Sequence, residues 1–533
     1  MSDPTQQSTG KRIGHKTLLG LAYLAVLAWF VWLGLNMTGR NALESYEKKW
    51  EARGEHFALA DFVPKPVPDD RNFALTPIVA TSYESVLDKN GHHLHTRNSH
   101  VVDRLDMNVD ASGVPLPYPS NGQDWLVPTP TNTGNWAMGE TTDLKEIQAY
   151  FRKLSTRTNM FPVSAQAQSP AADVLLALSK YDGTIEELRQ AAALPDSRFP
   201  LNYDAEPPAD ILLPHLAGLK ASSQVLELRA VAELQNGQSD KALADVKLML
   251  RLAQSIRSEP FLISHLVRIA AFNLALQPVW EGIRDHHWSD AQLEELNQEL
   301  SGMDFLADYE FAMRGERALT MANIEYMRRT RNIFNGVNDD GEDSQPALVL
   351  HLIPSSVFYR NELAIAQAHQ EWILPIVDVQ RHSVSPEAAE LAETNIEAMA
   401  ATFSFNNIFA RLVLSALERC PQRFGHAQSS ADMARVACAL ERYRLAQGEY
   451  PETLDALAPR FIESLPPDVI GGQPLKYHRT SDGKFALYSM GWNGTDDGGR
   501  VFRRTGGITS ALDFTKGDWV WSGQVVTDGN GQQ

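Results

Sequence analysis

The densest group of histidines in the chain is the stretch GHHLHTRNSH, which contains His92, His93, His95 and His100. Side chains alternate along a β-strand, so His93 and His95 would lie on one face and could chelate a transition metal. No carboxylate or cysteine stands beside them at a recognisable ligand spacing. The alternative is a surface loop with mostly neutral imidazoles, and the weak spacing favours that interpretation.

His265 and Arg268 are one helical turn apart in an apolar segment and could line a catalytic cleft between helices. A hydrogen bond between two packed helices would account for them equally well. Further along, Glu325 and Arg329 have the four-residue spacing of an ion pair on a helix face, which contributes about 0.2–0.5 kcal/mol. Charged residues in this central region therefore do not by themselves indicate catalysis.

Short catalytic and cofactor motifs are missing from the sequence. The chain contains no G-x-S-x-G elbow, phosphate-binding glycine loop, dinucleotide fingerprint or H-E-x-x-H helix. The stretch SDGK, residues 481–484, has the spacing of a Ser-x-x-Lys pair, but its Asp-Gly centre indicates a hairpin turn. A protein without enzymatic activity is favoured. The alternative is an anchored extracytoplasmic hydrolase with its cleft in the helical domain, near His265 and Arg268.

The overall composition is that of an ordinary globular protein with several domains. The chain has 533 residues, of which 43% are hydrophobic and 21% charged, enough for a sizeable core. Lys and Arg together number 48 against 66 Asp and Glu, which gives a formal net charge of -18. Because this charge repels nucleic acid phosphates, no nucleic acid partner is expected.

One long apolar run, TLLGLAYLAVLAWFVWLGLNM, covers residues 17–37. At about 1.5 Å per residue, a helix of this length crosses a hydrocarbon core of roughly 30 Å. Lys11, Arg12 and Lys16 precede the run. The positive-inside rule therefore predicts a single-pass inner-membrane protein, with residues 1–16 in the cytoplasm and the bulk in the periplasm. A cleaved signal peptide is the alternative, but the run is too long and lacks a small-x-small site.

Cys420 and Cys438 are the only cysteines, too few for a disulfide-stapled fold or a zinc ribbon. Their separation in sequence leaves two possibilities open, a disulfide in an oxidising compartment or two free thiols. Buried free thiols are favoured.

The chain after the anchor changes pattern near residue 141. Residues 38–141 are predicted to form a membrane-proximal stalk and a mixed, irregular region, because the range is Pro-rich near residues 64–68 and carries turn signals. Residues 142–425 are predicted to form an extracytoplasmic helical domain of long, apolar-faced segments with short breaks.

Two segments of the helical domain allow closer predictions. Asn236-Gly237 can end one helix and Ser239-Asp240 can cap the next, so an antiparallel helix pair is expected. The apolar segment that starts at Glu259 is long enough to suggest a second membrane span. Because His265 and Arg268 interrupt it, a buried helix is the favoured interpretation.

Residues 426–525 are predicted to form a small α+β domain, and residues 526–533 a disordered tail. The first helix of the α+β domain is expected to start near Ser429 or Ser430, which are good N-caps. It is expected to end at Gly448, which suits a left-handed position. A short helix follows. The runs PLKYHRT and KFALYSMG then flank Ser-Asp-Gly and predict a β-hairpin.

This order of signals resembles the soluble head of the type II secretion major pseudopilin (G-type). The helix end YRLAQGEYP, a short helix, LP.D, the strand LYSMG and a Gly/Asp loop near a tryptophan recur together, over roughly the last hundred residues. The resemblance implies a pilin-like α+β fold. It also implies a structural calcium ion in the loop after the last matched strand, held by carboxylates and main-chain carbonyls.

Carried over position by position, the resemblance places one calcium ligand at Asn493, where an amide replaces the family's aspartate and removes a charge. Asp496 and Asp497 could compensate for that charge. Asp518 takes roughly the place of the family's later aspartate, and Asp513 is a further candidate. The alternative is that these side chains are loop residues that serve turns and solvation.

The N-terminus departs from the pilin pattern, because Gly14-His15-Lys16-Thr17 lacks the glutamate that follows a processed pilin glycine. The whole chain is similar to uncharacterised membrane-anchored bacterial envelope proteins, through phrases such as GEHFALADFVPKPVPDDRN and SEPFLISHLVRIA. We therefore expect a mainly α, membrane-anchored binding or scaffold protein with envelope protein partners, beside a type II secretion or pilus-like system.

Overall fold

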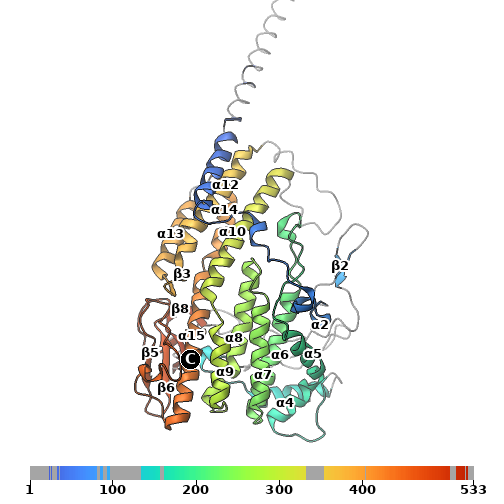
Figure 1. Cartoon of the computed structure of the whole chain (residues 1–533), viewed down its shortest axis with the longest axis vertical. Helices are drawn as coiled ribbons and strands as arrows, with labels where there is room; N and C mark the ends of the chain where they lie inside the picture. Colours follow the sequence, from blue (N-terminus) through green and yellow to red (C-terminus); the bar gives the residue numbers. More distant parts are fainter. Residues whose placement is uncertain are drawn as a thin grey trace, which may run out of the picture.

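The computed structural model describes residues 36–80, 85–87, 93–96, 134–156, 161–331, 353–401, 404–503, 512–522 and 524–525, with isolated positions before residue 36. Most of the predicted membrane span and the whole C-terminal tail lie outside this part of the chain. The described part is mainly helical with a small C-terminal strand region, which confirms the prediction of a mainly α protein. Figure 1 shows an elongated molecule with helix 36–51 at one end and the C-terminal strands toward the other.

The helices and strands follow the chain in an order that separates a helical body from the C-terminal sheets. The helices are α2 (Pro77–Ala80), α3 (Leu144–Ser155), α4 (Pro170–Leu178), α5 (Asp182–Ala192), α6 (His215–Gln235), α7 (Ser239–Ser255), α8 (Leu262–Arg284), α9 (Asp290–Ser301), α10 (Phe305–Thr330), α12 (Ser355–Ala368), α13 (Pro386–Ala401), α14 (Ile408–Leu414) and α15 (Cys420–Gln447). The strands are β1 (Ser85–Leu87), β2 (His93–Thr96), β3 (Val377–Asp378), β4 (Ser383–Val384), β5 (Lys476–Arg479), β6 (Phe485–Ser489), β7 (Arg500–Arg503), β8 (Leu512–Gly517), β9 (Trp519–Ser522) and β10 (Gln524–Val525).

The centre of the body is formed by α6, α7 and α8, which pack against one another. α6 ends at Gln235, Gly237 takes a positive φ of 71°, and α7 starts at Ser239, so the predicted helix pair is confirmed. Among the described helices, α8 alone is long and apolar enough to cross a membrane, yet 61% of its most apolar window is buried inside the protein. It also contacts α10 and α15, and its position matches the prediction of a buried helix.

The long helix α15 joins the body to the C-terminal sheets. It starts at Cys420, so the prediction of a start at Ser429 or Ser430 is wrong: both serines are buried in mid-helix, and the Ser430 hydroxyl donates to the carbonyl of His426 at 2.7 Å. Burial of the surrounding helix outweighs the tendency of serine to cap. The predicted end at Gly448 is confirmed by its φ of 88°.

The two cysteines also lie on α15, and both are buried and free. They are 18 residues apart in one helix. At 1.5 Å per residue this is about 27 Å, far beyond the roughly 7 Å limit for a disulfide. The prediction of buried free thiols is confirmed.

Two small sheets pack on α15 and on each other. One has the strand order β5-β6-β9 and the other β10-β7-β8. β5 and β6 are antiparallel, with Arg479 opposite Phe485 and Gly483 at a positive φ in the turn, which confirms the predicted hairpin. Trp519 and Trp521 of β9 join the main hydrophobic core, so the sheets and the helical body share one interior.

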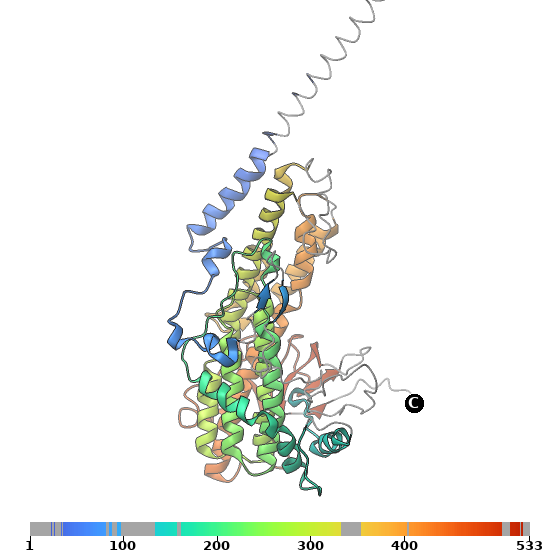
Figure 2. The same cartoon turned by 90° about the vertical axis from the view of Figure 1, so that its right-hand side faces the viewer.

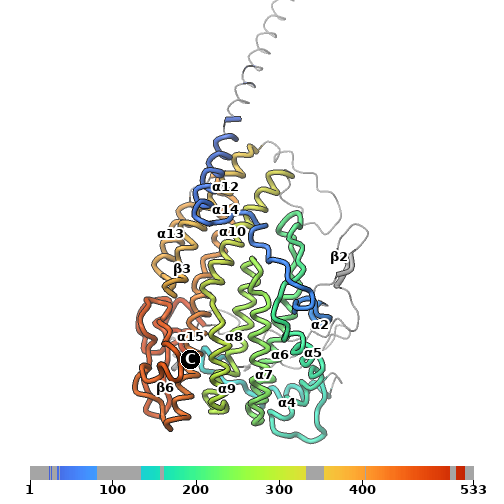
Figure 3. The backbone as a smooth tube through the Cα atoms, viewed as in Figure 1, coloured from blue at the N-terminus to red at the C-terminus, as the bar shows by residue number. Residues whose placement is uncertain are grey.

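The N-terminal part of the chain packs along the body. After helix 36–51 the chain runs down one side of the bundle (Figure 2), and its Phe73 and Ile78 are buried in the main core. Glu55 anchors this segment, because its carboxylate binds both Arg314 and Arg317 of α10 at 3.0–3.1 Å. The backbone trace in Figure 3 shows α12 beside the end of α10 that lies nearest helix 36–51, and α14 packs against α12.

Candidate ligand-binding cleft

The polar residues in the middle of the helical body form what we call the buried polar centre: His215, Glu259, Ser264, Arg268 and Asp308. Both oxygens of Glu259 are occupied, one by His215 Nε2 at 2.7 Å and the other by the Ser264 hydroxyl at 2.5 Å. Arg268 forms an ion pair with Asp308 at 2.7 Å. All five side chains are buried, so these interactions hold helices together and face no solvent.

His265, which the sequence pairs with Arg268, is also buried. Its Nε2 lies 2.9 Å from the Glu259 carbonyl oxygen, and burial lowers the pKa of its imidazole to about 3. A neutral, enclosed histidine does not titrate near neutral pH. His265 and Arg268 therefore do not line an open cleft, and the site predicted for a hydrolase is not found there.

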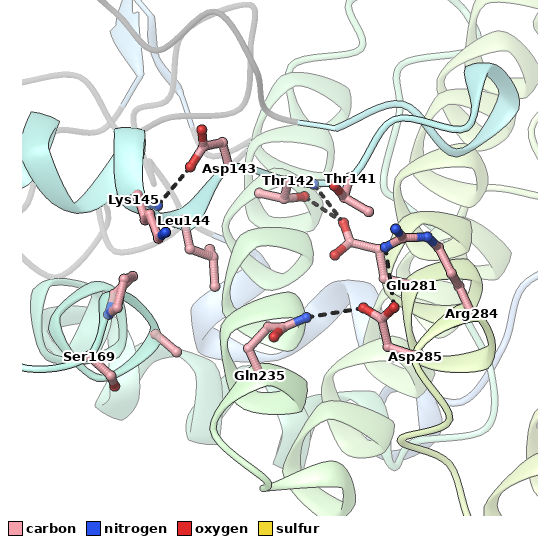
Figure 4. Close-up of a pocket in the computed structure, with 12 residues that line it drawn as sticks. Thr141, Thr142, Asp143, Leu144, Lys145, Ser169, Gln235, Glu281, Arg284 and Asp285 are labelled. Atoms are coloured by element: carbon pink, nitrogen blue, oxygen red, sulfur yellow. Dashed lines mark hydrogen bonds and ion pairs between the residues drawn. The ribbon is translucent and has the colours of Figure 1, made fainter. Parts of the chain in front are cut away.

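A cleft of about 480 Å³ does open elsewhere, where the ends of four helices meet (Figure 4). One wall holds the start of α3, with residues 141–145, and the start of α4, with residues 169–171. The opposite wall holds the end of α6, with Gln235, and the end of α8, with Glu281, Arg284 and Asp285. The volume falls in the range of small-ligand sites, roughly 300–1,000 Å³. Figure 1 places α4 at the end of the molecule away from helix 36–51.

The segment before α3 is held over α8 by two side chains one turn apart. Gln277 accepts from the amide of Trp136 at 2.6 Å and donates to the carbonyl of Glu140 at 3.1 Å. Gly134 permits this approach, because it has a φ of 87° and a Cβ there would lie 2.5 Å from Gln277 Nε2. The main chain at Thr142 is thereby fixed against Glu281.

Glu281 is the central acid of the cleft and is only 2% exposed. Its Oε1 accepts three hydrogen bonds, from the amide and hydroxyl of Thr142 at 2.9 and 2.8 Å and from Gln277 at 2.7 Å. Its Oε2 accepts none from the described residues. Burial raises the pKa of Glu281, and burial together with the charge of Glu281 raises the pKa of Glu227 on α6 well above its usual value.

The two walls differ in electrostatic character. Asp143 caps α3 and Ser169 caps α4, so two positive helix ends face the cleft. Lys145 adds a cation in the first turn of α3, and the carboxylate of Asp143 offsets part of this positive charge. The facing wall has the negative ends of α6 and α8 with Glu281 and Asp285, partly offset by Arg284. Such a cleft suits a ligand with a cationic and an anionic group a few ångströms apart.

The residues of the predicted calcium site lie in the second sheet and the loop before it. Asp518 is buried, and its carboxylate accepts from the main-chain amides of Asp497, Gly499 and Arg500 at 2.6–3.3 Å. Asn493 donates to Asp497 at 2.9 Å. These contacts fold the loop onto Asp518 through protein hydrogen bonds alone.

The two remaining candidates have separate partners. Asp496 accepts from the hydroxyl of Tyr488 at 3.1 Å and lies 3.5 Å from Lys476. Asp513, on β8, accepts from the amide and hydroxyl of Thr515. In the described part of the chain, no three His, Cys, Asp or Glu side chains are grouped so as to hold a metal ion. Calcium binding stays a prediction from the resemblance.

The histidine stretch is described only in part, and only through its backbone. β2 includes His93 and His95 and pairs with β1, whereas His92 and His100 lie outside the described residues. Sequence reasoning missed Glu281 and Glu227. The available signal was a carboxylate in the apolar run VWEGI, since an acid in a buried helix requires a polar partner or a function.

No protein-family model, curated protein or solved structure matches this chain. The likeness of the C-terminal domain to a pseudopilin head, and of the chain to envelope proteins, therefore rests on the sequence signals alone.

Proposed function

We propose that this chain is a membrane-anchored binding or scaffold protein of the bacterial envelope, and that its cleft takes a charged segment of a partner protein. In this proposal the apolar run of residues 17–37 spans the inner membrane, the N-terminus is cytoplasmic and the body is periplasmic. The cationic residues Lys11, Arg12 and Lys16 support that orientation. The cleft then faces away from the bilayer, within reach of other envelope proteins.

The observation that carries the binding role is the unfilled acceptor of Glu281. Thr142 and Gln277 fix the carboxylate through Oε1, so Oε2 is oriented before any ligand arrives. An ammonium or guanidinium group of a partner would satisfy it. A carboxylate on the same segment would then meet Lys145 and the positive end of α4.

The nature of the partner follows from the C-terminal domain. Its resemblance to a pseudopilin head supports a position beside a type II secretion or pilus-like assembly. The chain itself is not proposed as a pilin subunit, because its N-terminus lacks the pilin pattern.

The test is co-purification of the full chain, extracted in mild detergent, in three forms: wild type, Glu281→Gln and the control Glu390→Gln. Glu390 is exposed on α13, and its replacement removes the same charge outside the cleft. A charge-assisted hydrogen bond contributes about 1.5–3 kcal/mol, so Glu281→Gln should lower recovery of the partner roughly tenfold or more. Equal recovery by the three forms, or no envelope partner with the wild type, would contradict the proposal.

The competing function is the anchored extracytoplasmic hydrolase. One observation favours it: the neighbouring glutamates Glu227 and Glu281 both have raised pKa values, as general acids do. Turnover of a panel of chromogenic esters, peptides and glycosides by the wild type, lost in Glu281→Gln and kept in Glu390→Gln, would replace the binding proposal with this one.

A further inference from the structure

Three apolar side chains near the N-terminal end of the molecule are exposed to solvent, and we call them the apolar patch: Phe405, Ile408 and Leu412. They are 62%, 39% and 77% exposed. Ile408 and Leu412 are four residues apart on α14 and therefore share one face of that helix. Two large apolar side chains exposed on one helix face, with a third three residues before them, point to a contact with another apolar phase.

Hydrogen bonds show how far the patch lies from the predicted bilayer. Asn36, at the end of the predicted membrane span, accepts from the amide of Ser356 at 2.8 Å, so α12 starts beside the anchor. Ten residues further along the N-terminal helix, Tyr46 donates to Glu371 at 3.0 Å. Helix 36–51 and α12 therefore run in the same direction, away from the predicted bilayer.

Asn361 fixes the position of the patch along α12. Its side chain donates to the carbonyl of Phe405 at 2.8 Å and accepts from the amide of Phe409 at 2.9 Å. Asn361 is five residues after Ser356, a rise of about 7.5 Å along α12. Because the headgroup layer on each side of a bilayer is about 5–7 Å thick, the patch starts at the outer edge of the headgroups.

We propose that the apolar patch rests on the periplasmic face of the inner membrane and fixes the tilt of the body beside its anchor. The inference rests on the anchoring part of the proposed function. The anchor holds the patch at the bilayer surface, and apolar side chains that enter the headgroup boundary stabilise such a contact. Figures 1 and 3 show α14 at the same end as helix 36–51.

The experiment measures the depth of a nitroxide on the full chain in phosphatidylcholine vesicles. Leu412→Cys, and in a second variant Ile408→Cys, would carry the label. The native Cys420 and Cys438 are buried, and burial raises the pKa of both thiols to about 12, so they should not react. The matched control is Leu445→Cys, a 44% exposed leucine in the last turn of α15, at the far end of the molecule.

We expect the labels at 412 and 408 to collide more with dissolved oxygen and less with a water-soluble nickel chelate than the label at 445 does. Vesicles that also contain phosphatidylglycerol should give the same ordering, because the contact is apolar. Equal, water-like collision rates at all three positions would overturn the proposal. Dipolar broadening at position 412 that disappears on dilution with unlabelled chain would assign the patch to a second copy and would also overturn it.

Flotation separates this result from failure of the anchor. A chain that floats with the vesicles but has a water-like label at 412 contradicts the patch alone. A chain that does not float at all contradicts the anchoring part of the proposed function, and with it the patch.

Discussion

The buried polar centre and the cleft are built from the same kinds of residue but differ in how their acids are satisfied. Glu259 is buried and has a protein partner on each oxygen. Glu281 has three donors on one oxygen, and its other oxygen lines a cleft. A buried acid with complete partners stabilises the fold, whereas one left with an oriented, unused acceptor is ready to bind. Substitutions in the two regions should therefore affect different measurements.

The largest effect is expected at the buried polar centre. Arg268→Leu removes one partner of the enclosed Arg268–Asp308 pair and should lower the free energy of unfolding by about 3–5 kcal/mol. The matched variant is Arg284→Leu at the cleft, where the ion pair to Asp285 is partly exposed and contributes at most about 1 kcal/mol. Urea unfolding of both variants compares them. Similar losses would remove the distinction between the two regions.

Asp518 extends the comparison to a carboxylate enclosed by main-chain amides. Asp518→Ala leaves amides of the loop without an acceptor and should cost at least about 2 kcal/mol, whereas Asp513→Ala, at a half-buried side chain that bonds only within its own turn, should stay within about 0.5 kcal/mol. Thermal melting measures both. Equal melting temperatures would show that Asp518 does not hold the loop.

The same melting experiment tests calcium. Because Asp518 is already hydrogen-bonded by the protein, we expect the loop to be folded in chelator and the wild-type melting temperature to be unchanged by calcium. Stabilisation by roughly 2.7 kcal/mol at a hundredfold excess over the dissociation constant would establish the site that the pseudopilin resemblance implies. Its loss in Asp496→Asn or Asp518→Asn would then identify the ligands.

The pH dependence of stability offers a smaller effect at the cleft. Burial raises the pKa of Glu281, so the folded state binds this proton more tightly than the unfolded state. The resulting stability is complete below the ordinary glutamate pKa and is lost as the pH rises through the raised value. Urea midpoints measured upward from pH 4 should fall less in Glu281→Gln than in the wild type. An identical decline in both proteins would show that folding does not raise the pKa of Glu281.

Local signals in the sequence predicted the elements whose ends depend on nearby residues. The α6–α7 pair, the end of α15 at Gly448 and the β5–β6 hairpin follow from glycines and turns that act within a few residues. The predicted start of α15 was wrong because packing along the whole helix outweighs the capping tendency of Ser429 and Ser430. The predicted ion pair between Glu325 and Arg329 was also wrong. Glu325 binds Arg328 instead, and Arg329 binds Glu206, which is distant in the sequence.

The cleft could not be predicted, because it is formed by residues distant in the chain. Thr142 and Glu281 are 139 positions apart and meet only when α8 is placed under the segment before α3. His265 and Arg268, whose spacing suggested a catalytic pair, are instead buried in the interior. Their spacing on one helix was visible, but the helices that enclose them were not.

The central claim is that the cleft around Glu281 binds a partner protein, and photo-crosslinking in living cells tests it most directly. A benzophenone amino acid would replace the exposed Gln235 on the cleft wall or, as a control, Glu390 on α13. The account predicts a discrete adduct from position 235, no such adduct from position 390, and loss of the adduct when Glu281→Gln is added. No adduct from position 235, or an adduct unchanged by Glu281→Gln, would contradict it.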